Sequence, residues 1–97
     1  MAKLIIFNET NAQTLYEYGV RCINDGNYSA AYEALVKAKD LGHVPSMAKL
    51  GWLLVSGKHV IGKNGFRIGS EYLKEASEKG DTKAKEILSF YIYNQQQ

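Results

Sequence analysis

Apolar and polar positions alternate along this chain with the three- and four-residue spacing that is typical of amphipathic helices. The segment from Thr10 to Gln13 has the form of a capping box, which predicts that a first helix is capped by Thr10. Gly26 is expected to stop that helix. Its apolar face comprises Leu15, Tyr18, Gly19, Cys22 and Ile23.

A second helix is predicted after Asn27, whose side chain can cap the first turn. Gly42 follows it as a left-handed terminator. Gly19 and Ala31 are the small residues at which the two helices of an antiparallel hairpin would approach each other most closely. The apolar face of the second helix comprises Tyr28, Ala31, Leu35, Ala38 and Leu41.

The same order of small and apolar residues recurs downstream, with Pro45 in the first turn of a third helix. Gly51 and Gly69 repeat the close approach, and Asp81 is expected to cap a fifth helix. Stacked helical hairpins produce such a repeat. The apolar positions of the third, fourth and fifth helices are Met47, Leu50, Gly51, Leu54 and Val55, then Ile68, Tyr72, Leu73 and Ala76, then Leu88 and Ile92.

These patterns predict an all-α fold: a short α-solenoid of about two and a half helix-turn-helix repeats, made of five helices with a short N-terminal extended arm. The whole chain of 97 residues is then a single domain. Its parts are expected to be an arm over 1–10, a first hairpin over 11–42, a second hairpin over 45–80, a capping helix over 81–93 and a tail over 94–97.

Charge, cysteine content and the apolar segment near the N-terminus bear on the class of partner and on the cellular location. Twelve basic residues against ten acidic ones give a net charge of +2, which is too small to indicate a nucleic acid or an anionic membrane as partner. The single cysteine, Cys22, lies on an apolar helix face and is expected to be buried and unreactive. The apolar run Leu4 to Phe7 is too short for a secretory signal or a membrane span. We therefore expect a cytoplasmic protein.

The candidate chemical sites in the sequence are weak. Gly57 to Asn64 approaches the phosphate-binding pattern G-x-x-x-x-G-K, but Asn64 replaces the hydroxyl residue that binds magnesium, and helical spacing precedes it. His43 and His59 have no companion ligands at metal-binding spacing and are expected to be exposed loop residues. We expect no catalytic residues, no metal and no cofactor. A basic loop contact with a phosphate or an acidic surface remains open for Lys58, His59, Lys63 and Arg67.

Residues 12–45 resemble a tetratricopeptide unit of about 34 residues, and residues 46–80 resemble a Sel-one-like unit with a longer loop. Gly69 stands where the second family prefers alanine. The pattern positions are Leu15, Gly19, Ala31, Leu35, Ala38 and Pro45 in the first unit, and Leu50, Gly51, Gly57, Val60, Glu75, Ala76 and Gly80 in the second.

The resemblance implies a concave groove, lined by the first helix of each hairpin, that binds a peptide or a partner helix without catalysis. An alternative is that Trp52 and Phe90 belong to the core or are covered by the arm. The implied groove residues are Gln13, Tyr16, Val20, Ile23, Asn24, Ala48, Trp52, Val55, Ser56, Glu86, Phe90 and Tyr93.

The leading hypothesis is thus a non-enzymatic adaptor for another protein. Self-association as a homodimer is the first alternative, because two and a half repeats bury little surface. A small regulator or inhibitor of a host protein, from a phage or mobile element, is another alternative consistent with the short chain. Nucleic acid binding through surface lysines is not expected, since such lysines usually serve solubility.

Overall fold

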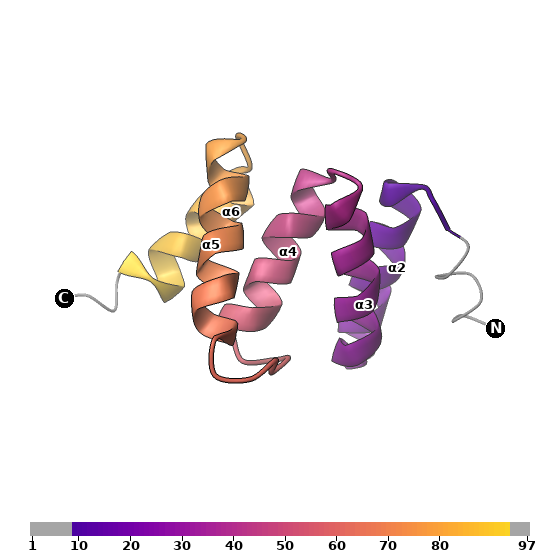
Figure 1. Ribbon diagram of the computed structural model, residues 1–97, viewed down its shortest axis with the longest axis horizontal. Helices are drawn as coiled ribbons and strands as arrows, with labels where there is room; N and C mark the ends of the chain where they lie inside the picture. The colour runs from indigo at the N-terminus through magenta and orange to yellow at the C-terminus, as the bar shows by residue number, and fades with distance from the viewer. Residues whose placement is uncertain (1–8, 94–97) are drawn as a thin grey trace.

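The computed structural model describes residues 9–93, and in this part of the chain it is all helical. Five helices follow one another (Figure 1), and no strand lies among the described residues. The all-α class is therefore confirmed, and the five predicted helices are all present within residues 9–93. The extended arm is predicted for residues 1–10 and the tail for residues 94–97, and of these, residues 1–8 and 94–97 lie outside the described residues. The helices are α2 (Ala12–Asn24), α3 (Tyr28–Asp40), α4 (Val44–Val55), α5 (Gly65–Glu78) and α6 (Thr82–Tyr91).

The helices stack as hairpins along one direction, giving an elongated body of 46 × 26 × 21 Å. Helices α2 and α3 form the first hairpin and α4 and α5 the second, with α3 packed on α4 between them (Figure 1). Helix α6 packs on α5 and α4 at the C-terminal end. This arrangement is that of a short α-solenoid, in which each unit covers the apolar face of its neighbour.

Three side chains cap the helices by accepting a backbone N–H of the first turn. Asn27 Oδ1 accepts from Ala30 N at 3.2 Å, and Asp81 Oδ1 accepts from Ala84 N at 2.8 Å, so both predicted caps are confirmed. The prediction that Thr10 caps the first helix is wrong. Asn11 takes the extended backbone of a cap, and its Oδ1 accepts from Thr14 N at 3.1 Å.

The predicted helix ends at Gly42 and Gly80 are confirmed. Their φ angles of +90° and +97° lie in the left-handed region, where a side chain would be strained. Leu41, in contrast, does not join the apolar face of α3 and is 51% exposed. It follows the last helical residue, Asp40, so the helical spacing no longer carries its side chain over the core.

Large aliphatic side chains fill the interior between the helices. Cys22 is buried there, as predicted. The predicted contact between Gly51 and Gly69 is present, whereas Gly19 packs more closely on Leu35 than on Ala31. None of the helices in residues 9–93 is both long enough and apolar enough to cross a membrane. The largest fully buried apolar residues are Leu15, Leu35, Leu50, Leu53 and Leu73.

Candidate interaction site

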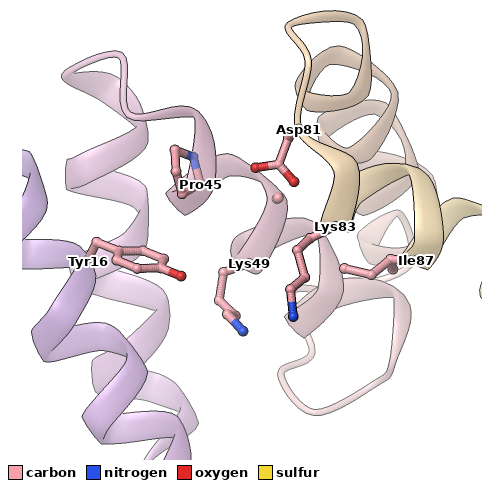
Figure 2. A pocket seen from close by; sticks show the side chains of 7 residues that line it. Tyr16, Pro45, Lys49, Asp81, Lys83 and Ile87 are labelled. Atoms are coloured by element: carbon pink, nitrogen blue, oxygen red, sulfur yellow. The ribbon is translucent and has the colours of Figure 1, made fainter.

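A pocket of about 140 Å³ lies where α2, α4 and α6 come together. These are the first helices of the two hairpins and the capping helix, so they are separated in sequence by α3 and α5. Figure 2 shows the side chains that surround the pocket. They are Tyr16, Pro45, Ala48, Lys49, Asp81, Lys83 and Ile87.

Two lysines give the pocket a positive character. Burial lowers the pKa of Lys49, and the positive charge of Lys83 lowers it further, while the Asp81 carboxylate acts in the opposite direction. Within residues 9–93, no carboxylate lies within ion-pairing distance of either ammonium. The Lys49 Nζ lies 5.9 Å from the centroid of the Trp52 ring. Two like charges therefore face one partly enclosed space.

Asp81 is held in place by its role at the start of α6. Its carboxylate accepts the Ala84 N–H at 2.8 Å, which fixes the side chain against the first turn of the helix. The same turn carries Lys83, and the next turn carries Ile87. The local signal that begins the helix thus also places an acidic and a basic group on the same side of the pocket.

A hydrogen-bonded cluster at the start of α4 borders the pocket. His43 Nε2 lies 2.9 Å from Gln13 Oε1, and His43 Nδ1 lies 2.7 Å from Ser46 Oγ. Because the Gln13 carbonyl oxygen only accepts, Nε2 carries the hydrogen, and in the neutral ring Nδ1 accepts from the serine hydroxyl. The ring also lies against Tyr16, with centroids 5.1 Å apart. The cluster joins α2 to α4 and supports one wall of the pocket.

His43 is therefore not the exposed loop residue that the sequence predicts. Burial lowers its pKa, and its partner Ser46 is fully buried. The sequence does carry one signal for this arrangement: a serine stands three residues after a histidine, at the start of a helix. The partner Gln13, far away in the sequence, has no such signal.

Only part of the expected groove lines the pocket. Tyr16 and Ala48 do so, while Gln13 lies beside it through its bond to His43. Phe90 is 66% exposed, so it is not part of the core of the described chain, and its ring makes an edge contact with Tyr91. Among the other expected residues, Val55 is buried, Val20, Ile23, Trp52 and Ser56 are half-buried, and Asn24, Glu86 and Tyr93 are exposed.

Sequence reasoning missed most of the residues that face the pocket from α4 and α6. Lys83 was expected to serve solubility, and Ile87 was given no role. Glu86, Phe90 and Tyr93 were expected in the groove but do not line this pocket. The repeat is the sequence signal that could have identified these residues. Pro45 and Lys49, which line the pocket from α4, occupy the same repeat positions as Lys83 and Ile87, which line it from α6.

Three of the four basic residues predicted for a loop contact have contacts with different parts of the described chain. The Lys58 Nζ lies 5.9 Å from the centroid of the Tyr28 ring, and the His59 and Tyr32 rings lie 4.6 Å apart. His59 is therefore half-buried against α3, which corrects the expectation of an exposed loop residue. Arg67 pairs with Glu71 at 3.1 Å, while Lys63 is exposed.

No group of three metal-ligating side chains of the kind His, Cys, Asp or Glu is found in the part of the chain that the structure describes. Comparison of the chain with protein-family models, with curated proteins and with solved structures gave no match.

Proposed function

We propose that this protein is a non-catalytic interaction module of the tetratricopeptide and Sel-one-like kind, acting in the cytoplasm. It binds a peptide segment or a helix of another protein along the face shared by α2, α4 and α6. As an adaptor, or as a regulator of that partner, it needs no chemistry of its own. The side chains that surround the pocket determine which partner the protein binds.

The pocket between three helices is the observation that carries this proposal. A ligand there touches Tyr16 from α2, Ala48 from α4 and Ile87 from α6 at once. Such a surface combines an aromatic ring, small apolar residues and charged groups, which is the composition of peptide-binding sites. Lysines beside apolar contacts supply orientation as well as contact area.

The test is selection of short peptides from a displayed library on the immobilised protein, followed by amide chemical-shift mapping of an enriched peptide. Shifts that concentrate on α2, α4 and α6 support the proposal. Shifts on α3 and α5, or no enrichment, contradict it. The variant Tyr16→Ala with Ile87→Ala removes two side chains that line the pocket, and it should lose the peptide while staying folded, as judged by circular dichroism.

A matched control for that variant is Phe66→Ala, which removes an aromatic side chain that is 43% exposed and outside the pocket. Its peptide affinity should equal that of the unmodified protein. If Phe66→Ala loses the peptide as completely as the double variant does, loss of binding reflects a general change in the surface or the fold.

Self-association is the second candidate, and the exposed aromatics in and just after α6 favour it. Phe90 and Tyr93 are 66% and 49% exposed at the C-terminal end of the described chain. Two copies could bury these rings against each other. Light scattering coupled to size exclusion tests this directly: a mass that stays monomeric as concentration rises excludes it, and a dimer lost in Phe90→Ser supports it.

A further inference from the structure

We infer that the pocket between α2, α4 and α6 takes the side-chain carboxylate of a glutamate or aspartate from the bound peptide, held between Lys49 and Lys83. This inference rests on the proposed function and adds the chemical class of the anchoring residue. It is carried by the charge of the pocket and by the shape of its apolar walls.

The charge of the pocket is unbalanced in the free protein. Lys49 and Lys83 contribute two positive groups and Asp81 one negative group, so one positive charge is left over. The Asp81 carboxylate accepts the Ala84 N–H and does not lie within ion-pairing distance of either ammonium. A single carboxylate from a partner neutralises the excess and separates the two like charges.

Burial makes the imbalance costly. The pKa of Lys49 is lowered mainly by its burial and then by Lys83, so the charged form is disfavoured in the free protein. An anion between the two ammoniums replaces part of the lost hydration with charge-assisted hydrogen bonds. These bonds strengthen as water leaves the pocket, which gives an acidic side chain more affinity here than on an open surface.

The walls of the pocket fit the methylene part of such a side chain. Pro45, Ala48 and Ile87 present aliphatic surface, and the ring of Tyr16 closes the side toward α2 (Figure 2). Glutamate and aspartate carry their carboxylate on a short aliphatic stem. The stem contacts these walls while the carboxylate reaches the two ammoniums.

The test uses peptide pools whose ends are acetylated and amidated, so that the ends carry no charge. Each pool holds glutamate at one fixed position, and its matched pool holds the isosteric, uncharged glutamine there. Binding is measured by fluorescence anisotropy of the labelled pools at low and at moderate salt. At one or more positions, the glutamate pool should bind the unmodified protein at least about tenfold more tightly.

The preference should vanish in the variant Lys49→Gln with Lys83→Gln. The control variant Lys74→Gln with Lys79→Gln removes the same charge from positions on and just after α5 that do not line the pocket, and it should keep the preference. This control separates a specific site from general attraction between a basic protein and an acidic peptide.

Four outcomes overturn the inference. Equal binding of the glutamate and glutamine pools contradicts the acidic anchoring residue but not the proposed peptide binding. A preference that survives in Lys49→Gln with Lys83→Gln places the anchor elsewhere. Failure of every pool to bind contradicts the proposed function itself. Binding that appears only when the peptides carry a free C-terminal carboxylate also contradicts the assignment to a side chain.

Discussion

Gly51 of α4 and Gly69 of α5 face each other so closely that a Cβ built on either would lie 2.9 Å from the carbonyl oxygen of the other. A backbone atom cannot move aside as the end of a flexible side chain can. The second hairpin is therefore held at a separation that only glycine permits at these two positions.

Gly51→Ala should lower the free energy of unfolding. The new methyl group would lie 2.7 Å from Leu73 Cγ as well as 2.9 Å from the Gly69 oxygen. Alanine gains about 1 kcal/mol in helix propensity, while overpacking costs roughly 1–3 kcal/mol. We expect a net loss of about 1 kcal/mol in urea unfolding followed by circular dichroism.

Two other glycines provide the comparison for Gly51→Ala. Gly19→Ala meets the Leu35 side chain at 2.9 Å and a carbonyl oxygen only at 3.6 Å, so it should cost less. Gly65→Ala meets only Ile61 Cγ1, at 3.4 Å, and should leave stability equal or higher. If Gly51→Ala is as stable as Gly65→Ala, the hairpin can relax and the close approach is not a constraint.

Asn27→Ala should cost about 1 kcal/mol of stability, because it removes the side-chain oxygen that accepts the Ala30 N–H at the start of α3. Asn64→Ala is the matched control. Asn64 also precedes a helix, α5, but its side chain makes no capping bond there. Denaturation midpoints of the two variants should therefore differ, and equal losses would contradict the assignment of the cap.

The stability of the protein should fall as the pH drops below about 6.5, the ordinary pKa of the histidine side chain. Burial lowers the pKa of His43 in the folded state. The unfolded chain then binds the proton more readily, so the contribution is full above the unfolded pKa and is lost as pH falls through the folded pKa.

The variant His43→Gln isolates this effect. The difference in unfolding free energy between the unmodified protein and the variant should be larger at neutral pH than at mildly acidic pH, since the variant has no proton to gain at this position. A difference that stays constant with pH, or that grows on acidification, would show that His43 is not destabilised by protonation.

Lys83→Gln should raise the pKa of Lys49, because it removes the positive charge that acts against the Lys49 ammonium. The Lys49 amine can be followed by nitrogen-15 NMR during a pH titration. Stability should change by no more than about 0.5 kcal/mol, as at most surface sites. An unchanged Lys49 titration in this variant would mean that the two lysines do not interact across the pocket.

His59 and Tyr32 should be coupled energetically by about 0.5–1 kcal/mol, since their rings lie 4.6 Å apart. The measurement is a double-mutant cycle of His59→Ala and Tyr32→Ala in urea unfolding. The backbone N–H of His59, which donates to Leu53 O at 3.2 Å, remains in both variants. If the losses of unfolding free energy in the two single variants add strictly in the double variant, the contact between His59 and Tyr32 does not stabilise the segment between α4 and α5.

Features set by neighbouring residues are predictable from the sequence here. The caps at Asn27 and Asp81 and the helix end at Gly42 follow from residue type and helical spacing, and the contact between Gly51 and Gly69 follows from the repeat. The error at Thr10 is also local. Thr10 and Asn11 are both good capping residues, and the choice between them depends on which backbone turns first into the helix.

The pocket is different, because it depends on how α6 is rotated against α4. The repeat places Leu88 and Ile92 correctly in the core. Glu86 and Ile87 are consecutive, so their side chains point about 100° apart around the helix, and it is Ile87 that lines the pocket. The contact between Gln13 and His43 likewise joins residues from separate hairpins, so no local sequence pattern predicts it.

The position of the pocket also bears on how the molecule holds together. Helix α2 packs chiefly on α3, and α6 packs on α5 and α4. Each helix is therefore stabilised mainly by its neighbours, and the stability of α2 depends little on that of α6. A ligand seated against Tyr16, Lys49 and Ile87 spans that sequence of contacts from one end to the other. A bound ligand should therefore link the two ends, because α6 could then open only if the ligand were released, and exchange of the α6 amide hydrogens should slow when the pocket is occupied.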